Sequence, residues 1–119
     1  MVLTKDGTLS SCVLPTNCVL IEWNFDNVKK SYDKLINIAE SLPRVKVVER
    51  TEDYWHGVVH SLIFRFPDDL EILKIPKKGI IQVRSASRLG IGDLGVNRNR
   101  IENLYSQLSM DKDLSYNSK

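Results

Sequence analysis

The chain has 119 residues, of which 42% are hydrophobic and 27% are charged, and its net charge is +2. These values are typical of one ordinary globular domain and exclude a disordered chain. No apolar run approaches the roughly 18 residues that a membrane-spanning helix needs, so we expect no transmembrane segment.

Residues 1–17 lack the basic start and the apolar segment of a secretory signal peptide. We therefore expect a cytoplasmic protein in which Cys12 and Cys18 are reduced thiols. Two cysteines with no other Cys and no nearby His are poor zinc ligands, so we predict neither a metal nor another cofactor. Residues 1–17 are interpreted as an N-terminal extension, 18–109 as a single domain and 110–119 as a polar tail.

Alternating apolar and polar residues predict a first strand over residues 18–25. Asp26 then has the character of a helix N-cap, and apolar residues recur at steps of three and four as far as Leu42. This pattern predicts a helix of about four turns that ends before Pro43, because the residue before proline is pushed out of the helical region. A second strand is predicted to begin at Val45.

The next part of the chain has the composition of antiparallel strands. Aromatic and β-branched residues predict a long third strand over residues 54–66. Residues 67–69 are predicted to bend the chain, 70–75 to form a fourth strand, 76–79 a hairpin turn and 80–86 a fifth strand.

The last predicted element is a helix capped by Asp93, with Leu94, Ile101, Leu104 and Leu108 on one face. The predicted order is β-α-β-β-β-β-α, and short connections make successive strands antiparallel. We predict an α+β domain of two layers, with a mainly antiparallel sheet of about five strands and two helices packed on one of its faces.

Two motifs suggest ligand sites that their context does not support. Residues 90–95, GIGDLG, have the spacing of a dinucleotide-binding loop, but that site needs a further strand with an acidic residue about twenty positions on, and only a helix and a polar tail follow. His56 and His60 are four apart, a metal-binding spacing on a helix, but on a strand they are about 13 Å apart and cannot share one ion.

Residues 77–100 hold six of the 17 basic residues and only one of the 15 acidic ones, Asp93. If Ile81 and Val83 face the helices, Arg84 lies on the helix-free face. Arginines there can gather around a carboxylate or phosphate, or they can form a lattice of Arg–Asp pairs that ties the loop to the sheet. The sequence leaves both interpretations open, and the four arginines concerned are Arg84, Arg88, Arg98 and Arg100. The stretch has no aromatic residue, so we do not expect nucleic-acid binding.

Residues 84–104, RSASRLGIGDLGVNRNRIENL, resemble the signature of the domain-of-unknown-function 1499 family. Three upstream stretches resemble that family's other motifs in the same order: 12–19, 53–56 and 64–71. The resemblance implies no established activity. Many relatives are exported or membrane-tethered, a location that we do not expect to transfer to this chain. The resemblance marks as motif positions Asp68, Asp69, Arg84, Ser85, Ser87, Arg88, Gly90, Asp93, Gly95, Asn97 and either Arg98 or Arg100.

The preferred function is non-catalytic binding of a small anionic or amphipathic ligand at an Arg/Asp polar centre, with Trp55 and Phe66 as an apolar wall. The predicted ligand-binding residues are Asp68, Asp69, Arg84, Ser85, Ser87, Arg88, Asp93, Asn97 and Arg98. One alternative is a hydrolase-like enzyme that uses Asp68 or Asp69 as the base and Arg84 to stabilise an oxyanion. The other alternative is a protein-interaction module that works through the open face of the sheet.

Overall fold

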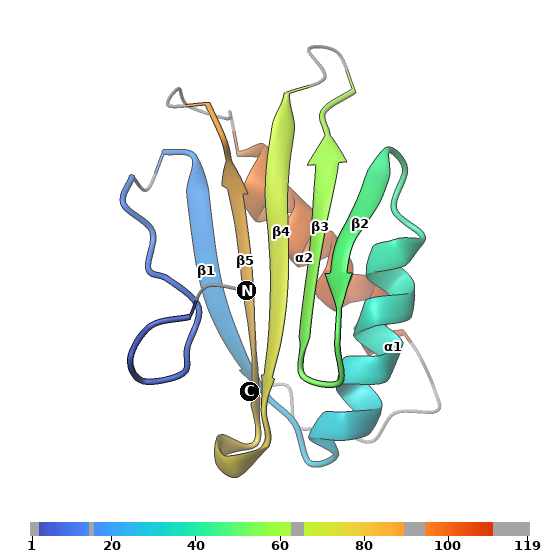
Figure 1. Ribbon diagram of the computed structural model, residues 1–119. Coiled ribbons are helices and arrows are strands. Elements are labelled where there is room, and N and C mark those ends of the chain that lie inside the picture. Colours follow the sequence, from blue (N-terminus) through green and yellow to red (C-terminus); the bar gives the residue numbers. More distant parts are fainter. Residues whose placement is uncertain (1–2, 15, 63–65, 90–94, 111–119) are drawn as a thin grey trace.

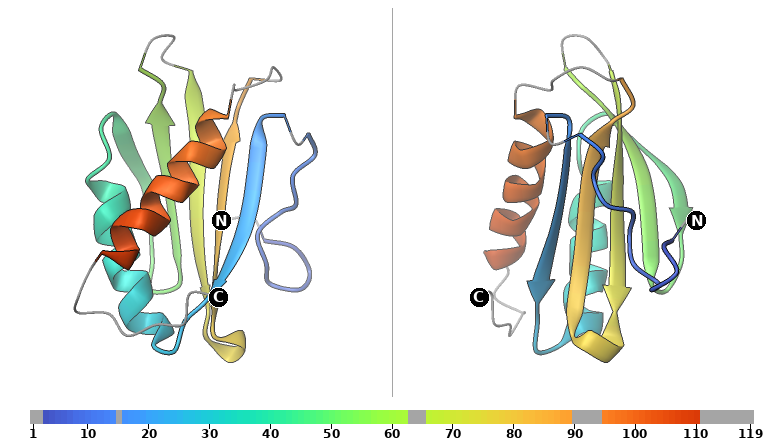
Figure 2. Two further views of the ribbon diagram at one scale, coloured as in Figure 1. Left: turned by 180° about the vertical axis from the view of Figure 1, so that it is seen from behind. Right: turned by 90° about the vertical axis from the view of Figure 1, so that its left-hand side faces the viewer.

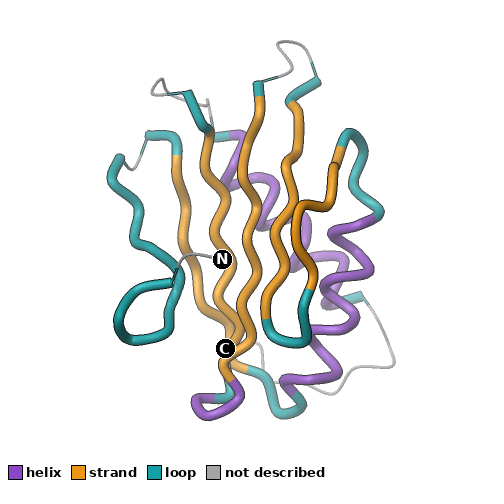
Figure 3. Tube along the Cα trace, in the orientation of Figure 1, coloured by secondary structure: helices purple, strands orange, loops and turns teal. Residues whose placement is uncertain are grey.

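The protein is described by a computed structural model that covers residues 3–14, 16–62, 66–89 and 95–110. Two helices lie on one face of a five-stranded antiparallel sheet, and none of the described residues forms a helix on the other face (Figures 1 and 3). This arrangement confirms the predicted α+β class and the order β-α-β-β-β-β-α. The elements are β1 (Cys18–Asn24), α1 (Val28–Glu40), β2 (Val45–Arg50), β3 (Tyr54–His60), β4 (Pro67–Ile75), a 3-10 turn (Pro76–Lys78), β5 (Ile80–Ser87) and α2 (Val96–Ser109).

The strands lie in the order β1-β5-β4-β3-β2. The chain leaves β1 at one edge, crosses behind the sheet in α1, and starts β2 at the other edge, from which three antiparallel connections lead back to β5 (Figure 1). The register sets Cys18 opposite Ala86, Asp68 opposite Ser87 and His60 opposite Pro67. The starts of β1 and β4 therefore meet the ends of β3 and β5 at one end of the sheet, which is at the top of Figure 1 and is called the upper end below.

The core lies between the sheet and the helices. Trp55, Ile72 and Val83 point from the sheet toward the helices and are fully buried together with Leu35 and Leu104. Burying each large apolar side chain contributes about 1.5–3 kcal/mol, so this layer is the main source of stability. No helix among the described residues is both long and apolar enough to cross a membrane.

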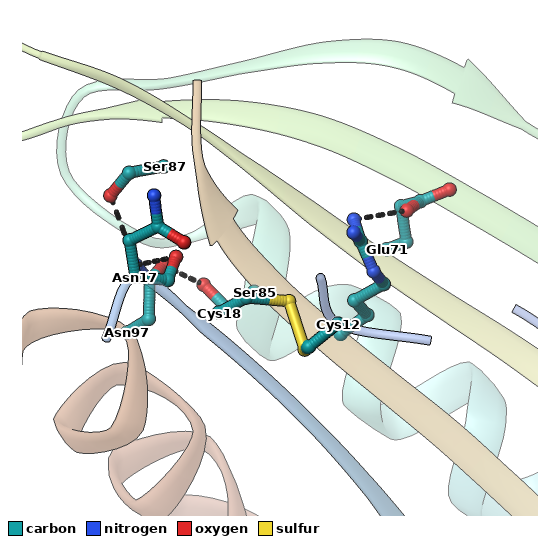
Figure 4. The surroundings of a disulfide bond; sticks show 8 residues. Cys12, Asn17, Cys18, Glu71, Ser85, Ser87 and Asn97 are labelled. Carbon is teal, nitrogen blue, oxygen red and sulfur yellow. Dashed lines mark hydrogen bonds and ion pairs between the residues drawn. A yellow bond between two sulfur atoms is a disulfide. The ribbon is translucent and has the colours of Figure 1, made fainter. Parts of the chain in front are cut away.

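The segment before β1 folds back over the helix-free face. Leu9 is buried there against Tyr54 and Leu73, and its backbone N–H donates to the side-chain oxygen of Gln82 at 2.9 Å. The expectation of reduced cysteines is wrong, because Cys12 and Cys18 form a disulfide with a Cα–Cα distance of 5.5 Å (Figure 4). The fold-back brings the two cysteines within bonding reach, and their sequence spacing gives no sign of it.

Some predicted boundaries differ from the observed ones. The N-cap of α1 is Asn27 rather than Asp26, since the Asn27 side chain accepts from the backbone N–H of Lys30 at 3.1 Å. β3 ends at His60, and residues 67–69 belong to β4 rather than to a bend. Pro67 is tolerated because it is the first residue of its strand. The predicted cap Asp93 lies outside the described residues, and the N-cap position of α2 is Gly95, whose φ of +82° suits glycine.

Candidate functional site

The motif residues of β4 and β5 divide between the two faces of the sheet. Asp68 and Asp69 are neighbours on one strand, and their side chains point to opposite faces, as the strand period predicts. Asp68 is 2% exposed and faces α2, whereas Asp69 lies on the helix-free face beside Arg88. The acidic bend and the arginines of the last strand and loop do meet in space. They form two separate polar clusters rather than the single centre that was expected.

The cluster on the helix side ties α2 to the sheet. Asp68 pairs with Nη1 of Arg100 at 3.0 Å, and that nitrogen also donates to Ser85 Oγ and to Asn97 Oδ1. The Asn97 amide donates in turn to Ser87 Oγ at 3.1 Å and to the Asn17 backbone oxygen at 3.2 Å (Figure 4). These bonds join the start of α2, the end of β5 and the start of β1, so they favour a structural role for this part of the motif.

The cluster on the helix-free face is centred on Asp69. Arg88 binds both carboxylate oxygens at 2.9 and 3.0 Å, and Nε2 of His56 lies 2.7 Å from one of them. Burial alone would raise the pKa of the Asp69 carboxyl, but the hydrogen bonds from Arg88 and His56 outweigh burial and hold this pKa below its ordinary value of 3.8. Asp69 is therefore the counterion of Arg88 and a hydrogen-bond partner of His56.

This lowered pKa predicts a contribution of Asp69 to acid stability. A carboxyl whose pKa is lower in the folded state than in the unfolded state stabilises the fold at pH values above the unfolded pKa of 3.8. That stabilisation is lost as the pH falls through the folded-state pKa. Wild-type protein should lose stability between about pH 4.5 and pH 2.5, and Asp69→Asn should lose about 1 kcal/mol less over the same interval.

Urea unfolding at the two pH values measures this difference, with Glu52→Gln at an exposed carboxyl as the matched control. Equal losses in Asp69→Asn and wild-type protein would contradict the role assigned to Asp69.

A second pair lies beside Asp69 on the helix-free face. Nη1 of Arg84 is 3.4 Å from Glu71, and the Tyr54 hydroxyl donates to the other oxygen of Glu71. Burial, followed by the bond to Glu71, raises the pKa of Tyr54. The prediction that Arg84 lies on the helix-free face is confirmed. Its partner is Glu71 rather than Asp68 or Asp69, so the hypothetical pairing of an aspartate base with Arg84 does not form.

Other expected neighbours of this centre lie elsewhere. Arg100 is on the helix side, and Arg98 is exposed and has no ion pair in the part of the chain that the structure describes, so the four arginines do not gather. Trp55 is fully buried in the core, where its indole N–H donates to Glu40, and it cannot form a pocket wall with Arg84 on the opposite face. Phe66 is half-buried. Asp93 and Gly90 lie outside the described residues.

A groove of about 330 Å³ opens on the helix side near the upper end. In Figure 2 the two helices diverge toward this end, where α2 begins and the chain turns from α1 into β2. The groove lies in this opening, and Val59 of β3 contributes to its lining. Its lining residues are Leu42, Pro43, Arg44, Val59, Val96, Asn99, Arg100 and Asn103.

The groove combines an apolar lining with two guanidinium groups. The Arg100 side chain is only 9% exposed, and its Nε and Nη2 make no hydrogen bond to a described residue. Arg44 is exposed, has no carboxylate partner among the described residues, and donates through Nε to the His60 backbone oxygen at 2.9 Å. With the exposed amides of Asn99 and Asn103, these groups can bind an anionic head, while the aliphatic side chains can contact a short apolar tail.

Arg100 was the only groove residue singled out by the sequence, as one possible motif position. A signal for three others was present, because Val96, Asn99 and Asn103 are spaced from Arg100 by the steps of three and four that place residues on one helix face. This face lies beside the buried face of α2, and it is polar except for Val96. Nothing in the sequence indicates that Arg44 lines the groove, because an arginine is not a residue type that indicates a left-handed backbone.

Comparison with known proteins gives one family and no characterised relative. The family model described as "Protein of unknown function (DUF1499)" matches residues 9–108. No curated protein matches the chain.

Proposed function

Because the chain belongs to the DUF1499 family, whose function is unknown, we propose a function from the geometry of the groove itself. The domain binds a small amphipathic anion, with the anionic head between Arg44 and Arg100 and the apolar part on Leu42, Val59 and Val96. Binding, without a chemical step, is the function proposed.

The observation that carries this proposal is the backbone of Arg44. Its φ is +60°, a conformation that costs a residue with a Cβ about 1–2 kcal/mol. Arg44 is also the only non-glycine residue with positive φ in the part of the chain that the structure describes. Residues held in this way cluster at binding sites, and here the strained backbone places at the edge of a groove a guanidinium with no carboxylate partner among the described residues.

The polar residues of the helix-free face support the two alternative functions less well. Asp69 is the counterion of Arg88 and a hydrogen-bond partner of His56, and Glu71 is the counterion of Arg84. Each of these two carboxylates is paired with an arginine, so neither of them is left as a free base. The groove has the opposite property, since Arg44 adds a positive charge that no described carboxylate balances.

We also infer that the protein works in an oxidising compartment. Disulfides form and persist in oxidising compartments, whereas the reducing cytosol would keep Cys12 and Cys18 as thiols. This inference replaces the cytoplasmic location expected from the sequence.

Isothermal titration with hexyl phosphate tests the proposed binding. A ligand of this size should bind wild-type protein with a Kd on the order of 0.1–1 mM. Arg44→Asn removes the charge and keeps a residue that tolerates the left-handed backbone, so it should weaken hexyl phosphate binding about tenfold. Hexanol has no anionic group, so its weaker binding should be the same in both proteins.

Arg98→Asn is the matched control, because Arg98 is an exposed arginine of α2 that has no carboxylate partner among the described residues and does not line the groove. It should bind hexyl phosphate like wild-type protein. Equal weakening by Arg44→Asn and Arg98→Asn would show a general charge effect and contradict the proposed site, as would the absence of binding to wild-type protein.

A further inference from the structure

We propose that the upper end of the domain docks on the surface of a lipid bilayer that contains anionic lipids. The proposal deepens the proposed function, because a bilayer is a source of amphipathic anions and the groove opens at this same end. It rests on the side chains that the upper end exposes, and its test is separate from that of the groove.

Exposed aliphatic side chains gather at the upper end on three separate segments. Leu62 follows β3 and is 69% exposed, and Leu89 follows β5 and is 39% exposed. Val13 and Leu14 precede β1 and are 88% and 45% exposed. In Figure 1 the segment before β1 reaches the upper end beside the end of β5. This exposed aliphatic surface at one end of the domain is the first observation behind the proposed docking.

Hydrogen bonds link these segments to one another. The Asn17 side chain donates to the Leu89 backbone oxygen at 2.9 Å, and the Arg88 backbone N–H donates to the Pro67 oxygen at 3.1 Å. The His60 N–H donates to the Arg44 oxygen at 3.1 Å, which extends the linked set to the edge of the groove. The exposed side chains are therefore carried on one framework and can meet a surface together.

The charge of the upper end complements an anionic surface. Arg44 and Arg98 have no carboxylate partner in the described ranges, and Arg88 is half-exposed beyond its pair with Asp69. The carboxylates that the structure describes in the loops and strand ends here are Asp68 and Asp69, and both are paired. Basic side chains near an anionic bilayer are attracted to it within a Debye length.

A bilayer fits these features better than a protein partner. The aliphatic side chains project from separate segments rather than forming the single flat patch that a protein interface needs. Aliphatic residues surrounded by basic ones are the pattern by which peripheral proteins insert shallowly at the headgroup boundary.

Flotation of the full chain with vesicles tests the docking. Wild-type protein should float with vesicles of phosphatidylcholine and phosphatidylglycerol at a molar ratio of 7:3. It should bind pure phosphatidylcholine vesicles at least tenfold less. Its binding to the mixed vesicles should be lost when NaCl is raised from 0.1 to 0.5 M. Leu62→Ser/Leu89→Ser should lower the partition coefficient on the mixed vesicles at least tenfold. The matched control is Val47→Ser/Val48→Ser, which alters two comparably exposed aliphatic residues of β2 and should leave binding unchanged.

Two measurements separate this proposal from the groove. Leu62→Ser/Leu89→Ser should keep wild-type affinity for hexyl phosphate, whereas Asn103→Trp, which fills the groove, should lose hexyl phosphate binding and still float. Absence of flotation, equal loss in the two Ser pairs, or insensitivity to phosphatidylglycerol would overturn the docking. Sedimentation equilibrium tests whether the protein self-associates through this surface. Self-association that Leu62→Ser/Leu89→Ser removes would identify the surface as an interface between copies of the chain and would also overturn the docking proposal.

Discussion

Replacing Arg100 with Ala should lower the free energy of unfolding by about 3–5 kcal/mol, which is the cost of leaving one partner of a buried ion pair alone. Asp68 is 2% exposed, and Oδ1 of Asp68 has no hydrogen-bond partner among the described residues. Arg100 is therefore its charge partner, and it also binds Ser85 and Asn97. Urea unfolding at pH 7 measures the loss.

The matched control is Arg98→Ala, two residues away on the same helix, where the exposed side chain should contribute no more than about 0.5 kcal/mol. The double variant Asp68→Leu/Arg100→Met replaces both charges with apolar groups and should recover at least half of the loss. A loss below about 1 kcal/mol in Arg100→Ala would show that water reaches Asp68 and that the cluster is not structural.

Removing the disulfide should lower the free energy of unfolding by about 2 kcal/mol, because the bond closes a short loop between residues six apart in sequence. Cys12→Ser/Cys18→Ser and reduced wild-type protein should have the same stability. The fold should survive in both, since the main core lies on the other face of the sheet. Thermal unfolding with and without a phosphine reductant measures the effect.

The double Ser variant is also the control for the reductant, which should leave the melting temperature of that variant unchanged. If the reductant left the melting temperature of wild-type protein unchanged as well, the bond would not contribute to stability.

The fold was largely predictable because its strands and helices show clear periods in the sequence. Because successive side chains of a strand point to opposite faces, the sequence of β5 placed Arg84 and Ile81 on opposite faces of the sheet. The same rule puts Asp68 and Asp69 of β4 on opposite faces. The disulfide was not predictable, because it depends on the fold-back of the segment around Leu9. That contact joins Leu9 to Gln82, which is 73 residues away in the sequence.

The candidate site was less predictable than the fold. The groove exists because α1 and α2 diverge toward the upper end, and the angle between two helices is set by packing that no local pattern reports. The hypothesis of Arg–Asp pairs between the loop and the sheet holds for Asp69 and Arg88, although the sequence did not single out this pair. The sequence could not assign Arg100 to Asp68, because that choice depends on how α2 lies across β5.

The groove is tested most directly by mapping the backbone and side-chain amide resonances during a titration with hexyl phosphate. Binding in the groove predicts that the largest shifts occur at Asn99 and Asn103 and that the side-chain amide of Gln82, on the helix-free face, stays unshifted. Largest shifts at Arg84, Arg88 and Gln82 instead would place the anion on the helix-free face and contradict the proposed function.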